Sequence, residues 1–399
     1  MQTRSGIVPI EWTDACLGDV YTERKEPGNE GLPLLMVSIH SGVSDGEVDE
    51  DDLPKKVKRI EDKSQYKRAA KGDLVFNMMR AWQGAIGTVR TEGMVSPAYI
   101  VAEPNDLVDP LFMDYYMKTN RMVHTIHRQS YGVTDFRLRL YWDSFAPIQC
   151  VIPSVAEQNK IAEILTTQDK VIELKEKLLA EKQRQKKYLM QQLLTGKKRL
   201  PGFDGEWKSV KLSEVLFERN EKNIEQNHRI CSVAVQKGVV DQVEHLGRSY
   251  AAADTSNYGV AHYGDVIYTK SPTGDFPYGI VKQSQMHEMV AVSPLYGIYE
   301  PVCYELGYIL HTYFSNAINC SNYLLPIVQK GAKNTINITN SVFVSNRLYL
   351  PTDCNEQKAL AEIFIAADKE LNLLRKELEQ EKQKKKALMQ LLLTGIVRV

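Results

Sequence analysis

A long helical stretch that occurs twice constrains the fold of this chain more than any other feature. The first copy runs from Ile152 to Gly196 and the second from Leu350 to Gly395. From Glu157 onward the two copies align without a gap at a constant offset of 199 residues, with 19 identities in 40 positions. A repeat of this length and similarity indicates a duplicated structural unit.

Each copy is expected to form one helix of about 40 residues, roughly 60 Å long at 1.5 Å per residue. Neither copy contains Gly or Pro between its opening proline and its closing Thr-Gly pair. Both are rich in Ala, Leu, Glu, Lys and Gln, which favour helices. Gly196 and Gly395 stand where a glycine ends a helix.

Apolar residues of the second copy are spaced alternately four and three apart, which is the pattern of a coiled-coil seam. They are Leu360, Phe364, Ala367, Leu371, Leu374 and Leu378, and Leu388 and Leu392 rejoin the phase. The first copy keeps the phase with Ile161, Leu165, Ile172, Leu179, Leu189 and Leu193, but has Gln168 and Lys175 in place of Ala367 and Leu374. Each helix is therefore expected to pair with the other. A two-fold relation between the copies would make them antiparallel, with the globular parts at opposite ends.

The stretches before the two helices are also similar to each other. Gly72 to Val89 resembles Gly264 to Val281, and Val95 to Pro104 resembles Val292 to Pro301. These blocks predict strands joined by polar loops. The predicted fold class is α+β: two similar globular α/β domains separated by two long antiparallel helices that form a coiled coil, with an internal pseudo-two-fold repeat. The predicted domains are residues 1–150 and 199–349, and the helical segments are 151–198 and 350–399.

Composition places few limits on function. The formal net charge is zero, so any affinity for nucleic acid must come from local patches or from basic partners. No apolar run is long enough to span a membrane, and the first residues lack the apolar core of a signal peptide, so a cytoplasmic location is expected. The six cysteines stand singly, which predicts reduced, packed thiols and no metal site.

Signatures of catalysis are missing from the sequence. There is no phosphate-binding glycine loop, no zinc-protease motif, no nucleophile elbow, and no Asn-Pro-Pro-aromatic stretch of the kind that holds a flipped adenine in a methyltransferase. We therefore expect no catalytic residue in this chain.

The remaining candidates for function are polar loops that occupy matched places in the two domains. Arginine, lysine, glutamine and asparagine side chains can read base edges, and aromatic rings can stack. The candidate DNA-binding residues of the first domain are Arg80, Trp82, Gln83, Tyr131, Thr134, Arg137 and Arg139. Those of the second domain are Lys237, Lys270, Ser271, Thr273, Lys330, Lys333, Asn334, Thr335 and Asn337. The alternative for each is an exposed loop side chain that contacts nothing.

The helix starts at 152–165 and 350–364, the helix ends at 189–196 and 388–395, and the blocks at 72–82 and 95–99 together resemble the specificity (S) subunit of type I restriction-modification enzymes. The resemblance covers nearly the whole chain. It implies that each domain reads one half of a bipartite, asymmetric site in double-stranded DNA, while the helices set the spacer and dock the methyltransferase subunits. Apolar residues outside the seam are then candidates for the partner interface: Ile164, Val171, Leu174, Leu178 and Ile363.

The resemblance also implies that the chemistry belongs to other chains. Two modification subunits would methylate adenine with S-adenosylmethionine, and two restriction subunits, where present, would use ATP and Mg²⁺. This chain is then a non-catalytic subunit without a cofactor of its own. The rival interpretation is a duplicated coiled-coil adaptor that binds proteins through its end domains and does not bind DNA, which the zero net charge favours.

Overall fold

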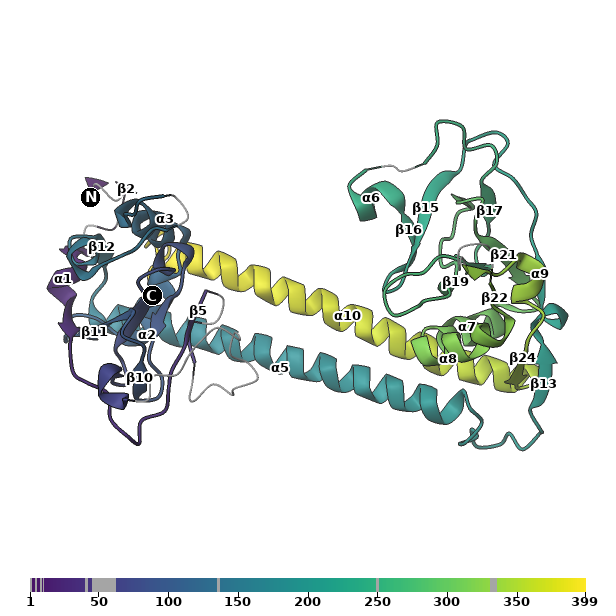
Figure 1. The fold of residues 1–399 in the computed structure, drawn as a ribbon, viewed down its shortest axis with the longest axis horizontal. Coiled ribbons are helices and arrows are strands. Elements are labelled where there is room, and N and C mark those ends of the chain that lie inside the picture. Colours follow the sequence, from purple (N-terminus) through teal and green to yellow (C-terminus); the bar gives the residue numbers. More distant parts are fainter. Residues whose placement is uncertain are drawn as a thin grey trace. The chain divides into compact units, whose positions relative to one another are not determined.

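The computed structural model describes residues 2–3, 6–7, 9, 11–39, 42–44, 62–134, 137–248, 251–330 and 336–399. The chain divides into two compact units, whose elements are labelled in Figure 1. Unit 1 consists of Met1–Glu176 and Lys376–Val399, and unit 2 of Lys177–Arg375. Each unit therefore contains one globular part and a portion of both long helices.

The two predicted long helices are confirmed. They are α5 (Val155–Leu193) and α10 (Cys354–Leu392), each 39 residues long and drawn as an unbroken ribbon in Figure 1. Gly196 and Gly395 follow the helix ends with φ of 68° and 72°, a conformation that costs a glycine little. The predicted seam is half-buried or fully buried along both helices, whereas most positions between its residues are exposed.

The helices run antiparallel within each unit. In unit 1, Asp169 and Lys175 of α5 pair with Lys385 and Glu377 of α10, at 2.5 and 2.7 Å. Residue numbers therefore rise along one helix as they fall along the other. In unit 2, Lys182 pairs with Glu370 at 2.7 Å, and Lys186 pairs with Asp368.

The two polar residues of the seam have partners on the opposite helix. Gln168 is buried, and its Nε2 donates to the main-chain oxygen of Glu381 at 3.2 Å and to the Glu381 carboxylate at 2.8 Å. Lys175 donates to Glu377. These contacts explain how a glutamine and a lysine are accommodated in an otherwise apolar seam, because a buried polar group is tolerated when it is hydrogen-bonded.

The globular part of unit 1 is built around a four-stranded antiparallel sheet in the order β4-β11-β8-β9. Smaller two-stranded sheets pair β3 with β12, β5 with β6, β7 with β10 and β1 with β2. The elements are β1 (Gln2–Thr3), β2 (Gly6–Ile7), β3 (Thr13–Cys16), α1 (Leu17–Val20), β4 (Tyr21–Arg24), β5 (Val37–Ser38), β6 (Gly42–Val43), η2 (Lys63–Gln65), β7 (Lys67–Ala69), β8 (Leu74–Asn77), η3 (Ala81–Gln83), β9 (Ile86–Thr88), β10 (Gly93–Val95), β11 (Tyr99–Pro104), α2 (Pro110–Met117), α3 (Asn120–Gln129), α4 (Trp142–Phe145) and β12 (Gln149–Ile152).

Unit 2 repeats this plan, with a sheet in the order β14-β21-β18-β19 and a pair of β13 with β24. In unit 2 a second four-stranded sheet has the order β16-β15-β20-β17, with β15 and β20 parallel. In unit 1 the corresponding strands form separate pairs, β5 with β6 and β7 with β10, joined by a parallel bridge between Leu34 and Met94. The elements are β13 (Lys208–Lys211), η4 (Leu212–Glu214), β14 (Leu216–Glu218), β15 (Arg229–Ala234), β16 (Gly238–Asp241), α6 (Gln242–Leu246), β17 (Gly259–Ala261), β18 (Val266–Tyr268), β19 (Val281–Gln283), β20 (Val290–Val292), β21 (Gly297–Pro301), α7 (Tyr304–Phe314), α8 (Ala317–Leu324), η5 (Leu325–Ile327), β22 (Gln329–Lys330), β23 (Ile336–Asn337), α9 (Asn340–Phe343) and β24 (Arg347–Leu350).

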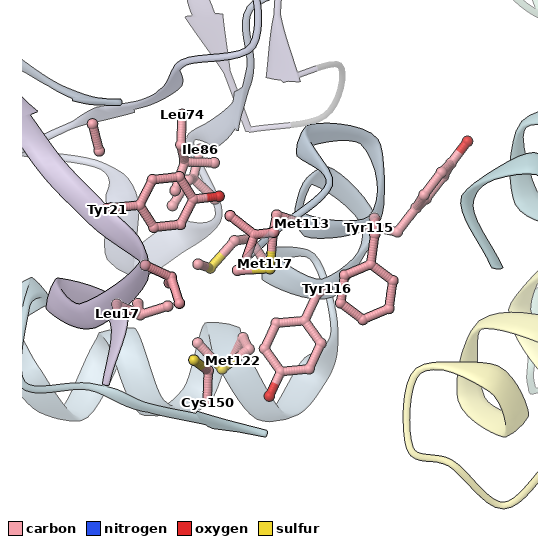
Figure 2. Packing of buried hydrophobic residues seen from close by; sticks show 14 of the residues in the cluster. Leu17, Tyr21, Leu74, Ile86, Met113, Tyr115, Tyr116, Met117, Met122 and Cys150 are labelled. Atoms are coloured by element: carbon pink, nitrogen blue, oxygen red, sulfur yellow. The ribbon is translucent and has the colours of Figure 1, made fainter. Parts of the chain in front are cut away.

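A large core cluster of unit 1 consists of apolar side chains from the sheet, from α2 and α3, and from the long helices. Figure 2 shows Leu17, Tyr21, Leu74 and Met113 among its members. Ile161 and Leu165 of α5 and Leu392 of α10 belong to the same cluster, so the helix pair is part of the domain core. In unit 2, Leu360 and Phe364 of α10 pack with Leu193 of α5 and with Tyr308 of α7 in the same way.

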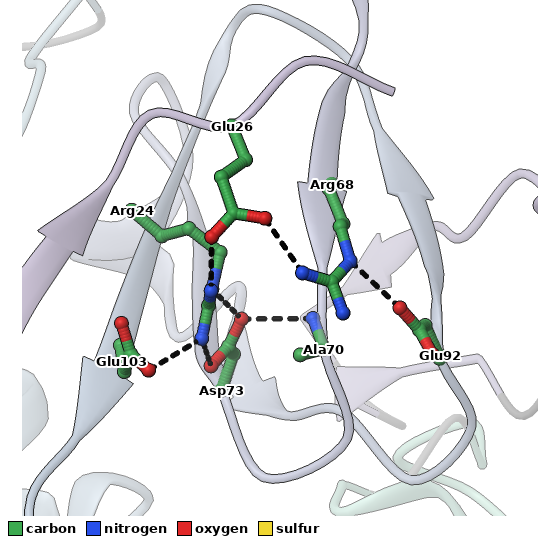
Figure 3. A network of polar contacts seen from close by, with 7 residues as sticks. All are labelled: Arg24, Glu26, Arg68, Ala70, Asp73, Glu92 and Glu103. Carbon is green, nitrogen blue, oxygen red and sulfur yellow. Dashed lines mark hydrogen bonds and ion pairs between the residues drawn. The ribbon is translucent and has the colours of Figure 1, made fainter. Parts of the chain in front are cut away.

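The repeated Gly-Asp pair has a structural role in both sheets. Asp73 precedes β8 and accepts hydrogen bonds from Arg24 of β4 at 2.7 and 3.3 Å, while Arg24 also pairs with Glu103 at 2.8 Å (Figure 3). Burial lowers the pKa of Arg24, but the hydrogen bonds and charges of Asp73, Glu26 and Glu103 together outweigh this effect and raise the pKa above its usual value. In unit 2, Arg219 and Asp265 make the same pair at 2.7 and 3.1 Å.

Two helices follow β11 in unit 1 and β21 in unit 2, and Thr119 and Asn316 cap the second of each pair, α3 or α8. Short helices, α4 and α9, precede the last strands. One detail differs from the sequence-based expectations. The six cysteines are free thiols as expected, but Cys354 is exposed rather than packed because it opens α10.

Candidate nucleic-acid interface

The first candidate loop of unit 1 connects β8 to β9 and contains a single turn of 3-10 helix, η3. Arg80 caps this turn, and Gly84 ends it with φ of 99°. The side chains of Arg80 and Gln83 are exposed. Trp82 is half-buried, since its Nε1 donates to the main-chain oxygen of Met79 at 3.0 Å and its ring lies 5.6 Å from that of His127. Arg80 and Gln83 can therefore reach a ligand directly, while Trp82 supports the loop from beneath.

The second candidate loop of unit 1 is a narrow hairpin. Tyr131 and Arg139 exchange two main-chain hydrogen bonds of 3.0 and 2.9 Å, and Thr134 and Arg137 are exposed near the tip. Residues 135 and 136 lie outside the described part of the chain. The Tyr131 ring lies 5.3 Å from that of Tyr141, whose hydroxyl accepts a hydrogen bond from Arg139 at 3.4 Å.

The structure brings these two loops together. The main-chain nitrogen of Leu140 donates to the oxygen of Met78 at 2.9 Å, so the end of the hairpin lies beside the start of the η3 loop. Arg80, Arg137 and Arg139 therefore lie on neighbouring segments as three exposed guanidinium groups. Tyr141, which supports Arg139, and Arg128, exposed on the helix that carries His127, were not identified from the sequence. No spacing pattern marks either residue.

In unit 2 the β18–β19 loop occupies the place of the η3 loop. Lys270 adopts a positive φ of 60°, which is rare for a residue with a side chain and is concentrated at functional sites. Burial lowers the pKa of the half-buried Lys270, and the nearby Glu218 partly opposes this effect. Ser271 and Thr273 are exposed, and Thr273 forms a tight turn with Phe276 through two main-chain hydrogen bonds of 3.0 Å. The loop thus has a defined shape and presents different polar groups from those of unit 1.

The other candidates in unit 2 are only partly described. Lys330 and Asn337 lie on the paired strands β22 and β23, while Lys333, Asn334 and Thr335 fall outside the described residues. Lys237 is exposed at the β15–β16 turn, which belongs to the second sheet of unit 2 and not to the sheet that carries Lys270.

The candidates for the partner interface divide into two groups. Ile164 and Ile363 are half-buried and pack against the cores of their own units. Leu174 and Leu178 are exposed by 65% and 43%, and Leu373, which corresponds to Leu174 in the repeat, is exposed by 51%. Val171 is half-buried. The exposed leucines are therefore better placed to meet a partner than the two isoleucines are.

Among the described residues, no group of His, Cys, Asp and Glu side chains is arranged to hold a metal ion. Within the same residues, no helix is both long enough and apolar enough to cross a membrane.

No protein-family model matches the sequence. The type I restriction enzyme MjaVIII specificity subunit of Methanocaldococcus jannaschii is 24% identical over 332 residues, which cover 77% of this chain and 75% of that protein. Among solved structures, the S subunit of a type I restriction-modification system from M. genitalium matches 96% of both chains with a TM-score of 0.60 and 12% identity. The HsdS subunit from Thermoanaerobacter tengcongensis matches 98% of both chains with a TM-score of 0.50 and 17% identity.

The chain shares the fold of these specificity subunits. A third structure, described as concerning complex assembly and conformational transition of the type I restriction-modification system, matches 98% of this chain with a TM-score of 0.52 and 15% identity. All three matches extend over almost the whole chain, so they include both units and both long helices. At these identities the similarity establishes the fold.

Proposed function

We propose that this chain is the DNA-reading specificity subunit of a type I restriction-modification complex, in which each globular domain recognises one half of a bipartite, asymmetric site. One observation carries the proposal. The same sheet order occurs in both units, but the loop that follows the equivalent strand holds Arg80-Ala-Trp-Gln83 in one and Lys270-Ser-Pro-Thr273 in the other. A repeated scaffold with unlike polar loops suits a ligand with two unlike halves. The similarity to specificity subunits supports the same assignment.

The chemistry of the loops fits double-stranded DNA. A guanidinium group can form two hydrogen bonds with guanine in the major groove, and an amide can do the same with adenine. Arg80 and Gln83 offer these two groups from one exposed turn, while Arg137 and Arg139 are available for phosphates or bases. In unit 2 the corresponding groups are an ammonium and two hydroxyls, which form less specific contacts. We therefore expect the two half-sites to differ in sequence.

The helices are assigned the roles of spacer and of docking surface. Each has 39 residues and measures about 58 Å at 1.5 Å per residue, which corresponds to about 17 base pairs at 3.4 Å each. Leu174, Leu178 and Leu373 are large apolar side chains exposed on these helices. Burial of such leucines by two methyltransferase subunits would be favourable.

The chain is proposed to act as a non-catalytic subunit in the cytoplasm, with domain boundaries at residues 150, 198 and 349. S-adenosylmethionine would then be bound by the modification subunits, and ATP and Mg²⁺ by restriction subunits where these are present. The absence of catalytic sequence signatures is consistent with this division of labour.

Co-expression with a candidate methyltransferase chain tests the proposal. We expect a stable complex that methylates adenine at one bipartite sequence, detected by single-molecule sequencing of genomic DNA with and without this gene. A complex that forms but leaves the methylation pattern unchanged, and that is not retained on DNA, would favour the adaptor without DNA binding.

A further inference from the structure

Each unit contains a tyrosine, an aspartate and a lysine that join three elements in the same way. In unit 1, the Tyr115 hydroxyl on α2 donates to Asp169 on α5 at 2.7 Å, and Lys385 on α10 pairs with the other oxygen of that carboxylate at 2.5 Å. In unit 2, the Tyr308 hydroxyl on α7 donates to Asp368 on α10 at 2.9 Å, and Lys186 on α5 pairs with the other oxygen. We refer to these two groups as the Tyr-Asp-Lys clasps.

The helical members of the clasps are repeated in the sequence. Asp169 and Asp368, and likewise Lys186 and Lys385, are identical pairs at the offset of 199 residues. The repeat exchanges the helices, since the helix that supplies the aspartate in one unit supplies the lysine in the other. Each clasp therefore connects a globular part to both long helices.

The tyrosine hydroxyls remain protonated donors at neutral pH. Burial raises the pKa of Tyr115, and its hydrogen bond to Asp169 raises the pKa further. Burial and the Asp368 carboxylate do the same for Tyr308. In unit 1 the Lys385 ammonium also lies 5.5 Å from the centre of the Tyr115 ring, which adds a cation–π contact.

A second attachment lies near the start of the helix. The Gln158 amide accepts a hydrogen bond from the main-chain nitrogen of Asp109 at 2.8 Å and donates to the oxygen of Leu107 at 2.9 Å. Asp169 follows 11 residues later on the same helix, about 16 Å further along its axis. Besides the apolar packing of Ile161, Leu165 and Leu392 in its core, the domain of unit 1 is thus bonded to the helix pair at two separated points.

This separation limits how far the domain can tilt. A domain of 150 residues has a radius of gyration of about 15 Å. If the domain tilts by about 13° with the Gln158 attachment as the pivot, a point about 15 Å from the pivot moves by one base-pair step of 3.4 Å. The same tilt moves the clasp by about 3.6 Å, because it lies at a similar distance from the pivot. A hydrogen bond of 2.7 Å does not survive such a displacement. The domain can therefore shift by one base pair only if the clasp breaks.

We propose that Tyr115 and Tyr308 are positioning residues that hold each recognition domain at a fixed tilt on the helix pair and so fix the number of base pairs between the half-sites. This inference rests on the proposed function, and it adds a determinant of spacer length outside the reading loops. The tyrosines touch no base in this scheme, so they should affect the spacer without affecting the half-site sequences.

The test is the distribution of spacer lengths among methylated sites. The variants are Tyr115→Phe, Tyr308→Phe and the double variant, each assembled with the methyltransferase chain. Loss of a hydrogen bond to a charged group typically changes an equilibrium by roughly tenfold. We therefore expect methylation at sites with a spacer one base pair longer or shorter to rise about tenfold in each single variant, and further in the double variant. Tyr188→Phe, at an exposed position on α5, is the matched control.

The outcomes separate this inference from the function on which it rests. If the unmodified complex methylates no bipartite site, the proposed function fails. If it methylates one site and the double variant keeps a single spacer length, the clasps are not positioning devices. Altered half-site bases in the variants would also contradict the proposal. The proposal is supported if the tyrosine variants methylate sites with a broader range of spacer lengths and unchanged half-site bases. Lys385→Arg keeps a positive charge beside Asp169, so this variant should show the same spacer lengths as the unmodified complex.

Discussion

Lys282 provides a sharp test of the energetics of unit 2, because its ammonium group is buried and no carboxylate among the described residues bonds to it. Only 5% of Lys282 is exposed, and its Nζ donates to the Ser315 hydroxyl at 3.0 Å. Burial, followed by the nearby Lys186 ammonium, lowers the pKa of Lys282 from 10.5 to about 8, although Asp368 acts in the opposite direction. By the strand registers the equivalent residue of unit 1 is Gly87, so the fold does not require a lysine here.

The pKa difference sets the size and the pH range of the effect. Below pH 8 both the folded and the unfolded chain carry the proton, and the folded state bears the full cost of the buried charge, on the order of 3 kcal/mol. Between about pH 8 and 10.5 the folded chain releases this proton while the unfolded chain keeps it. Because the unfolded state then binds more protons, the Lys282 contribution to stability rises with pH across this range.

Lys282→Met should remove this cost and its pH dependence. We expect the unfolding free energy of unit 2 to increase by up to about 3 kcal/mol at pH 7, with little change at pH 10. The Ser315 hydroxyl keeps its hydrogen bond to the main-chain oxygen of His311 at 2.7 Å, so no new unpaired donor is created. Lys222→Met, at an exposed lysine of the same unit, is the control.

Pulse-labelling hydrogen exchange measures the two units separately. The protein is equilibrated in urea at pH 7 to 10 and labelled briefly at one fixed pH, and the fraction unfolded is read from α7 for unit 2 and from α2 for unit 1. The α2 peptides should not respond to the substitution. If Lys282→Met lowers the stability of unit 2 at pH 7, or leaves its rise above pH 8 intact, the assignment of an unfavourable buried charge is wrong.

Three further predictions follow from the structure. Tyr21→Phe should stabilise unit 1 by about 1 kcal/mol in the same assay, because no described polar group bonds the buried Tyr21 hydroxyl. Unit 2 has Leu216 at the equivalent position, so the fold does not need a hydroxyl there. A loss of stability would show that the Tyr21 hydroxyl has a partner. Arg80→Ala should relax one methylated half-site and Lys270→Ala the other, and equal effects on both half-sites would contradict separate reading. Insertion of four residues after Lys177 and another four after Leu374 should lengthen both helices by about 6 Å. Methylation maps should then show a spacer about two base pairs longer, with unchanged half-sites. An unchanged spacer would refute the role of the helices in setting the spacer.

The periodic parts of this fold were predictable from the sequence. The long helices, their ends at Gly196 and Gly395, and the strands around the Gly-Asp pairs follow from local spacing and turn chemistry, and the structure confirms them. The parallel pairing of β15 with β20 was not predictable, because it joins strands some 60 residues apart that carry no matching signal. Non-local pairings of this kind depend on the packing of the whole unit.

The positions of the candidate loops in the chain were predictable from the sequence, but the contacts of their side chains were not. The sequence identified Arg80 and Trp82 as neighbours, but it could not show that the Trp82 N–H is already bonded to a main-chain oxygen. The sequence did not identify Tyr115 as a residue that bonds to the long helices. It lies in the run Phe112 to Tyr116, where three of five residues are aromatic and any of them could equally have been a buried core side chain. The signal was the identity of its helical partners in the repeat, Asp169 with Asp368 and Lys385 with Lys186.

The differences between the two helix copies favour pairing of α5 with α10 over pairing of like helices. Lys175 meets Glu377 in the observed register, but in an α5–α5 pair the position of Glu377 is taken by Leu178. Lys382 meets Glu176, but in an α10–α10 pair it would face Arg375.

Like pairs therefore leave a lysine opposite an apolar or a like-charged side chain, while the mixed pair satisfies both. A polar residue in a coiled-coil seam lowers stability but selects the partner and the register. The divergence of the two copies at these positions thus disfavours pairing of two α5 helices or of two α10 helices.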